Sequence, residues 1–241
     1  RPDGWGKWRT QGLQVEFGCV RRRRMKAFSI RCDNPVLVAQ FERPHAMLSW
    51  SLTRPGFAVA SRVAWLYVRN DDLPLGLDPV RFLKERMSSM GLDDAVHLMT
   101  SRDIRKHHVA EASAGPATAT CLATVGLGNA ARVGTAPTPH ECGGTINLLV
   151  HVDRPLSQAA FVEAISIATQ ARTVALVDQE WKPHGEVVTG TGTDCIVVAA
   201  PPGDPEEQFA GLHTDIGAAV GRAAYDAVML GAKAWIAEHG A

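Results

Sequence analysis

Short strand-like segments dominate the first 70 residues of this chain, whereas long helical segments dominate its second half. Each early segment is rich in Val, Phe, Trp or Leu and is bounded by Gly, Pro or Asn, as strands usually are. They span 13–17, 25–30, 36–41, 47–52 and 63–69, and further strands are predicted at 95–99, 117–125, 145–152 and 195–200. This order indicates an α/β or α+β fold, a mixed sheet covered by a few helices in a single domain.

Three helices follow from capping signals. Asp78 and Pro79 are suited to the N-cap and first position of a helix that Gly91 closes, and Ser157 is suited to cap a helix running to about Thr173. A closing helix is expected over 214–238, where apolar residues recur at helical spacing. We expect one domain over 1–241, with a strand-rich part (1–75) and an α/β part (76–241).

Composition excludes several classes of function. The 25 Lys and Arg residues balance 25 Asp and Glu residues, so neither nucleic acid nor a membrane surface is an expected partner. No hydrophobic run approaches the length that spans a bilayer, and the first residues lack the apolar core of a signal peptide. We therefore expect a cytoplasmic protein without membrane insertion. The five cysteines are dispersed without a C-x-x-C pair, which argues against a disulfide framework.

Two motif-like patterns do not support a cofactor or metal. Gly126-x-Gly128-x-x-Ala131 follows a strand as a dinucleotide fingerprint does, but Gly134, Pro137 and Pro139 stop the helix that the fingerprint requires. The histidines at 107–108 and 140 lack zinc-binding spacing, and no Gly-x-Ser-x-Gly elbow is present. We expect no protein-bound metal and infer no required cofactor.

The segment Thr189-Gly-Thr-Gly-Thr-Asp194 leads directly into the hydrophobic run 195–200. A buried strand needs only the hydrophobic run, so the three hydroxyls, two glycines and carboxylate call for another explanation. One interpretation is a tight structural turn. The other is a ligand-binding segment, because glycines let a backbone approach a ligand and Asp194 supplies acceptors and a base.

Six turns and strand ends together resemble the adenosylcobinamide amidohydrolase family of corrinoid salvage. The matching pieces occur in order: Leu48-Ser49-Trp50, Met99-Thr100-Ser101-x-Asp103, Thr124-Val-Gly-Leu-Gly-Asn-Ala130, Gly144-Thr-Ile-Asn147, Thr189–Asp194, and Gly211-x-His-Thr214 with Gly217, Gly221 and Tyr225. The chain departs from the family pattern at one place, where Thr53-Arg54-Pro55-Gly56 stands instead of an Asn-Gly-Gly turn. This departure bears on specificity or rate.

The resemblance implies hydrolysis of the amide between aminopropanol and a corrin-ring propionate, giving adenosylcobyric acid. The partner would be a corrinoid small molecule, whose cobalt belongs to the substrate. Hydrolysis of an amide needs an activated water or nucleophile, an oxyanion stabiliser and a proton for the departing amine.

We hypothesise that Asp194 activates water, that His213 protonates the leaving nitrogen, and that Asn129, Asn147 and nearby backbone N–H groups hold the oxyanion. In the alternative mechanism Thr193 is the nucleophile. The residues predicted to bind substrate are Ser49, Trp50, Thr100, Asn129, Asn147, Thr191, Gly192 and Thr214.

Two other functions stay open at this point. The altered 53–56 turn suggests a corrinoid-binding or carrier protein without catalysis, and a third hypothesis is an amidohydrolase for a smaller amide. The sequence also leaves a homodimer open and does not give the order of the strands.

Overall fold

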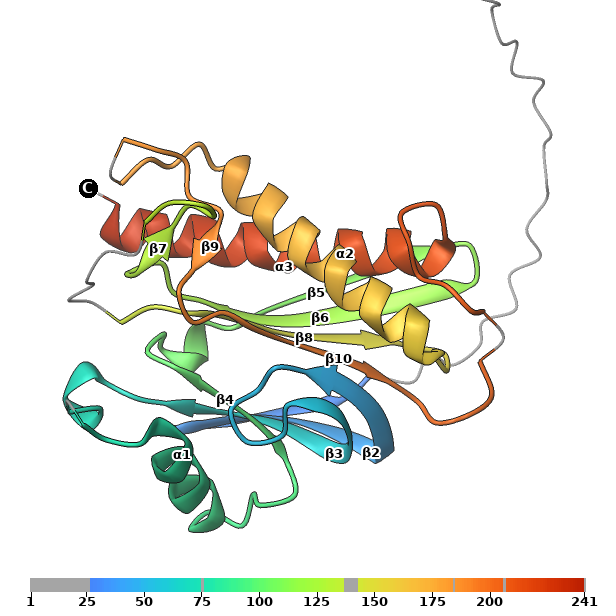
Figure 1. Ribbon diagram of the computed structural model, residues 1–241, viewed down its shortest axis with the longest axis horizontal. Coiled ribbons are helices and arrows are strands. Elements are labelled where there is room, and N and C mark those ends of the chain that lie inside the picture. Colours follow the sequence, from blue (N-terminus) through green and yellow to red (C-terminus); the bar gives the residue numbers. More distant parts are fainter. Residues whose placement is uncertain (1–26, 75, 137–142, 184, 206, 241) are drawn as a thin grey trace, which may run out of the picture.

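The computed structural model describes residues 27–74, 76–136, 143–183, 185–205 and 207–240, which form a mixed sheet with three α-helices (Figure 1). The strand order is β4-β3-β2-β10-β8-β6-β5, and β1 pairs with β2. Pairs β3–β4 and β8–β10 are parallel and the other pairs are antiparallel. The α/β class expected from the sequence is confirmed.

The strands are β1 (Ser29–Asp33), β2 (Val36–Ser49), β3 (Gly56–Tyr67), β4 (Val96–Thr100), β5 (His108–Ala114), β6 (Ala117–Val125), β8 (Ile146–Val152) and β10 (Cys195–Ala200). Two short strands, β7 (Ala130–Ala131) and β9 (Gly190–Thr191), form a separate ribbon. The helices are α1 (Pro79–Ser88), α2 (Gln158–Val177) and α3 (Asp215–His239), with short 3₁₀ turns at Asn70–Asp72 and Ile104–Lys106.

The sheet bends so that its two halves face each other. In Figure 1, α2 and α3 lie above the half made of β5, β6, β8 and β10, and α1 lies below the half made of β2, β3 and β4. Side chains alternate accordingly: Leu148 and Val150 pack toward α2 and α3, whereas Leu149 joins Trp65 in the core between the two halves. Leu66 lies in a third core against α1. Strand periodicity thus explains three apolar layers.

Capping residues set the start of each helix, and Asp78 and Ser157 are the caps that the sequence predicts. Asp78 accepts hydrogen bonds from the N–H groups of Val80 and Arg81. Ser157 accepts from Ala160 N, and Thr214 accepts from Gly217 N at 2.9 Å. Each side-chain oxygen satisfies an N–H that has no partner inside the helix.

Several predicted boundaries are wrong. Segment 36–41 and residues 47–49 of segment 47–52 belong to one strand, β2, whose pairing with β3 shifts between Gln40 and His45, and the strand ends at Ser49. Strand β5 was not predicted, because its small and polar residues lack the β-branched and aromatic side chains typical of strands. The predicted strand 13–17 lies outside the described residues.

Helix α2 also corrects the sequence-based view of membrane spans. By length and composition it is apolar enough to cross a bilayer, contrary to the expectation that no such run exists. Here its buried side chains, such as Phe161, Ala164 and Ala168, pack into the core above the sheet. This placement is that of a core helix.

The ends of four strands meet at one edge of the fold. Strands β8 and β10 run parallel and begin beside each other, with Cys195 opposite Asn147. Strand β2 runs antiparallel to β10, so its last residue, Ser49, lies near the start of β10, opposite Val197. Strand β4 ends nearby, since Asn147 Nδ2 donates to the Met99 carbonyl at 2.8 Å.

Candidate active site

A cavity of about 530 Å³ is lined by residues from this edge of the fold. Its walls come from the ends of β2 and β4, the starts of β8 and β10, and the turn that follows β6. The structure therefore brings together residues that are far apart in the chain. The predicted site residues that line it are Trp50, Thr100, Asn129, Asn147, Gly192, Thr193 and Asp194.

The Asp194 carboxylate has partners on all sides. Its Oδ1 accepts from Ile146 N at 3.0 Å and from the Thr191 hydroxyl, and its Oδ2 accepts from Thr191 N at 3.1 Å. Oδ2 also forms a close ion pair with Arg172, and the two side chains are only 9% and 13% exposed. A carboxylate has about four acceptor positions, so none is left to bind a water proton. In this structure Asp194 does not have the geometry of a base, contrary to the hypothesis from sequence.

Gly190 makes room for this ion pair. A Cβ at Gly190 would lie 2.4 Å from an Arg172 guanidinium nitrogen and 2.9 Å from Asp194 Oδ2. Thr189, in turn, accepts from Val133 N at 2.7 Å and donates its own N–H to the Ala131 carbonyl. The 189–194 segment is therefore a tight structural turn whose outer residues, Gly192 and Thr193, border the cavity.

A glycine contact fixes the turn after β6 against the start of β8. A Cβ at Gly144 would lie 2.5 Å from Gly128 N, 2.9 Å from Asn129 N and 3.1 Å from Asn129 Oδ1. The Asn129 Oδ1 atom is buried and has no hydrogen-bond partner among the described residues. Two backbone nitrogens and an amide oxygen without a described partner thus lie together beside Gly144, and Asn129 itself lines the cavity.

Thr193 and Asn147 are both tied to backbone carbonyls. The Thr193 hydroxyl donates to Gly144 O at 3.0 Å, and its own carbonyl accepts from the Thr145 hydroxyl at 2.7 Å. Asn147 is 1% exposed and uses one N–H on Met99 O. Asn147 therefore joins β8 to the free edge of β4, which shapes the cavity.

The residues that follow β2 form a second wall. Trp50 is 45% exposed, and its indole N–H donates to the Asp194 carbonyl at 2.6 Å. Ser49 is buried and is not among the residues that line this cavity, and its hydroxyl donates to Arg54 O at 3.4 Å. The Arg54 guanidinium donates to the Asp93 carbonyl at 3.0 Å. The turn that departs from the family pattern is therefore held by local hydrogen bonds.

His213 and Thr214 lie at the opposite end of the fold. Thr214 caps α3, whose first residue Asp215 is next to Gly115 in the β5–β6 turn, whereas Gly231 of α3 packs on Val125 beside the cavity end. Gly231 follows Asp215 by 16 positions, which is about 24 Å along a helix. Within one chain, exposed His213 is therefore not brought together with Asp194, and Thr214 is a helix cap rather than a substrate ligand in this geometry.

Two residues at the site carry no sequence motif. Arg172 comes from the last part of α2, close to where the helix was expected to end, and no local pattern marks its ion pair. His97 on β4 lines the cavity and is only 4% exposed. Strand alternation places His97 on the face of β4 that packs toward α1, opposite to Val96 and Leu98, but does not show that a cavity lies there.

Cys195 also lines the cavity, and burial raises the pKa of its thiol to about 12. It therefore stays protonated and is a poor nucleophile at neutral pH. Among the described residues, no group of three or more His, Cys, Asp or Glu side chains is arranged to hold a metal ion. His140, Glu141 and Cys142 lie outside the described residues.

Comparisons with known proteins agree with the motifs that meet at this cavity. A family model described as adenosylcobinamide amidohydrolase matches residues 20–240. A protein of that name from Halobacterium salinarum is 30% identical over 157 residues, which are 61% of this chain and 64% of that protein. The match thus spans less than two thirds of the relative's length.

A solved structure, the crystal structure of the PH0078 protein from Pyrococcus horikoshii OT3, is also similar. It is 10% identical, with a TM-score of 0.40 over 81% of this chain and 76% of that chain. This likeness is too low to support an argument about function.

Proposed function

Because the chain belongs to the adenosylcobinamide amidohydrolase family, we propose that it hydrolyses the amide joining aminopropanol to a corrin-ring propionate of adenosylcobinamide. The products would be adenosylcobyric acid and 1-amino-2-propanol, as expected of an enzyme in cobalamin salvage that works in the cytoplasm. The substrate brings its own cobalt, so the proposal needs no metal held by the protein.

One observation carries the proposal beyond the family name. Five of the six family-like motifs, separated by up to 145 positions between Ser49 and Asp194, converge on one edge of the sheet. The sixth motif has a structural explanation, since a Cβ at Gly217 would lie 2.0 Å from the Gly211 carbonyl. We therefore infer that the five motifs that meet at the cavity bind the substrate.

The cavity suits part of a large, amide-fringed ligand. Its wall combines the exposed face of Trp50 with amide and hydroxyl groups, the mixture typical of sites for ligands that are partly apolar. A neighbouring cavity of about 610 Å³ shares Val68, Ser101 and Gly143 with it. A corrinoid would place the scissile amide in the first cavity and extend toward the second.

Oxyanion stabilisation is assigned to the turn after β6. The N–H groups of Gly128 and Asn129 lie beside Gly144, and the Asn129 side-chain amide lies near Gly192, whose Cβ would be 3.8 Å from Nδ2. Donors arranged in advance stabilise a developing oxyanion more than water does. In this proposal Asn129 contacts the substrate, whereas Asn147 and Asp194 hold the starts of β8 and β10 in place at the cavity.

Thr193 as nucleophile remains an alternative mechanism. Its side chain is at the mouth of the cavity, but its hydroxyl donates to a backbone carbonyl and not to a base. A nucleophilic hydroxyl normally needs an adjacent base. A covalent cobyryl-enzyme detected by mass spectrometry would support this route, and Thr193→Ala with full turnover would exclude it.

The experiment that tests the function is incubation of the purified protein with adenosylcobinamide, followed by chromatography of the corrinoids. Formation of adenosylcobyric acid with release of aminopropanol is the expected result. Binding without product would instead support a corrinoid carrier. Neither binding nor product would support an amidohydrolase for a smaller amide.

A further inference from the structure

Ser101 lies where the two cavities of the site adjoin. It lines both the first cavity, of about 530 Å³, and the second, of about 610 Å³. Val68 and Gly143 line both cavities as well, but neither carries a polar side chain. A ligand that extends from the first cavity into the second therefore meets the Ser101 hydroxyl on its way.

The Ser101 hydroxyl is not committed to another part of the protein. Five described hydroxyl side chains line the first cavity, and four of them form hydrogen bonds within the protein, those of Ser51, Thr100, Thr145 and Thr193. The fifth belongs to Ser101, which is half-buried and whose hydroxyl bonds to no described residue. This hydroxyl can therefore donate a hydrogen bond to a ligand or accept one from it.

The backbone on both sides of Ser101 is held in place. Before it, the Met99 carbonyl accepts from Asn147 Nδ2 at 2.8 Å. After it, Arg102 N donates to Thr100 Oγ1 at 3.0 Å, and the Arg102 side chain is only 5% exposed. A hydroxyl on such a fixed segment is positioned before the ligand arrives, which lowers the entropic cost of binding.

The two cavities differ in chemical character, and this difference indicates how the substrate is oriented. Trp50, Leu52 and Leu73 give the first cavity an apolar wall. Charged side chains line the second cavity: Arg69, Arg102, Asp103, Lys106 and Glu238. The flat, partly apolar corrin ring suits the first wall. The hydroxylated aminopropanol arm suits the second cavity, because a hydroxyl leaves water at little cost only where it finds polar partners.

We propose that Ser101 binds the leaving arm of the substrate, through a hydrogen bond between its Oγ atom and the hydroxyl of the aminopropanol. This inference rests on the proposed function. Ser101 thereby favours the one amide that carries a hydroxylated arm over the other amides on the fringe of the corrin ring. It takes no part in breaking the carbon–nitrogen bond, so its contribution is to substrate binding and specificity.

The test compares two substrates, adenosylcobinamide and the propylamide of adenosylcobyric acid, which lacks only the hydroxyl of the arm. For the wild type, we expect kcat/KM to be about three- to tenfold lower with the propylamide, the change that one neutral hydrogen bond makes. Ser101→Ala should show the same loss with adenosylcobinamide, mainly through a higher KM, and no further loss with the propylamide. This double-mutant cycle measures whether the two hydroxyls interact.

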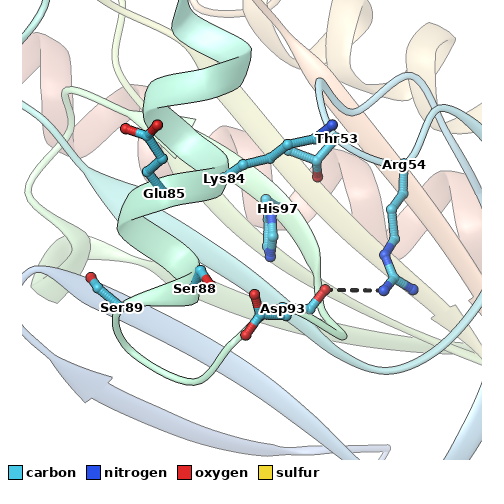
Figure 2. A pocket seen from close by; sticks show the side chains of 8 residues that line it. All are labelled: Thr53, Arg54, Lys84, Glu85, Ser88, Ser89, Asp93 and His97. Atoms are coloured by element: carbon cyan, nitrogen blue, oxygen red, sulfur yellow. Dashed lines mark hydrogen bonds between the residues drawn. The ribbon is translucent and has the colours of Figure 1, made fainter.

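Ser88→Ala is the matched control, because the Ser88 hydroxyl also faces a cavity away from the proposed substrate path. Ser88 is the last residue of α1 and lines a third cavity, of about 580 Å³, between α1 and the 53–54 turn (Figure 2). Among its described lining residues this cavity shares His97 with the first cavity and none with the second. We expect Ser88→Ala to keep the wild-type kcat/KM with both substrates.

The outcomes separate this inference from the function on which it rests. A wild type that forms no adenosylcobyric acid from either substrate overturns the proposed function, and the role of Ser101 with it. A wild type that cleaves both substrates equally well overturns only the role of Ser101, and this comparison decides even if Ser101→Ala does not fold. A Ser101→Ala variant that still prefers adenosylcobinamide also overturns it. So does a fall in kcat of about 100-fold with unchanged KM, which is the effect of losing a catalytic group.

Discussion

Asp194→Asn tests whether this carboxylate holds the site together or performs the chemistry. The substitution leaves Arg172, whose side chain is 13% exposed, beside a neutral amide. Removing one partner of a buried ion pair destabilises a protein by about 3–5 kcal/mol, because the other charge stays buried without compensation. For a domain of this size each kcal/mol lowers Tm by about 2–4 °C, so we expect Tm to fall by about 6–20 °C.

The matched control is the double variant Asp194→Asn with Arg172→Met. It removes the uncompensated charge and leaves the Asn oxygen able to accept from Ile146 N and the Thr191 hydroxyl. We expect it to recover at least half of the lost stability, and part of the lost turnover, because the cavity wall is restored. Thermal unfolding and urea unfolding would be measured beside turnover of adenosylcobinamide.

The opposite pattern would refute this reasoning. If Asp194→Asn keeps a wild-type Tm but loses 10²–10⁴-fold in turnover, the scale expected for a lost base, then Asp194 acts chemically. The double variant would then not recover turnover either, and Asp194 would be the base, as the sequence suggested.

Three further predictions follow from local geometry and from pKa shifts. Gly144→Ala should lower turnover at least about tenfold because its Cβ would lie 2.5 Å from a backbone nitrogen of the turn after β6, whereas Gly126→Ala, whose nearest contact would be 3.5 Å, should not. Hydrogen bonds led by Arg102 lower the pKa of Glu238 to about 2, so wild-type Tm should fall as the pH drops from 4.5 toward 2, and Glu238→Gln should weaken that dependence. Burial lowers the pKa of His151 to about 4, so the unfolded chain binds its proton first and stability should fall from pH 6.5 to 4; His151→Gln should flatten this slope in urea titrations, and an unchanged slope would contradict it.

Local rules predicted much of the fold. The caps Asp78 and Ser157 and the strands over 117–125 and 195–200 are where the sequence puts them, and the closing helix begins beside its expected first residue, Thr214. These features depend on neighbouring residues, so a single sequence contains the information. Strand β5 and the continuity of β2 were missed, because pairing with partner strands stabilises segments whose own composition is neutral.

The candidate site was likewise predicted only in part from the sequence. The motifs marked Trp50, Thr100, Asn129, Asn147 and Thr193, and the structure places all of them around one cavity. The expected pairing of His213 with Asp194 is not found within the chain, because motif order says nothing about which end of the sheet a loop reaches.

The sequence by itself determined the class of fold, the helix starts and the family to which the chain belongs, since those depend on local residue types and motif spacing. Only the tertiary structure decided which motif residues share a cavity and that Asp194 forms an ion pair with Arg172. The physical reason is that the state of a charged or basic group is set by its spatial neighbours, and bending one sheet onto itself brings together residues that are distant in the chain.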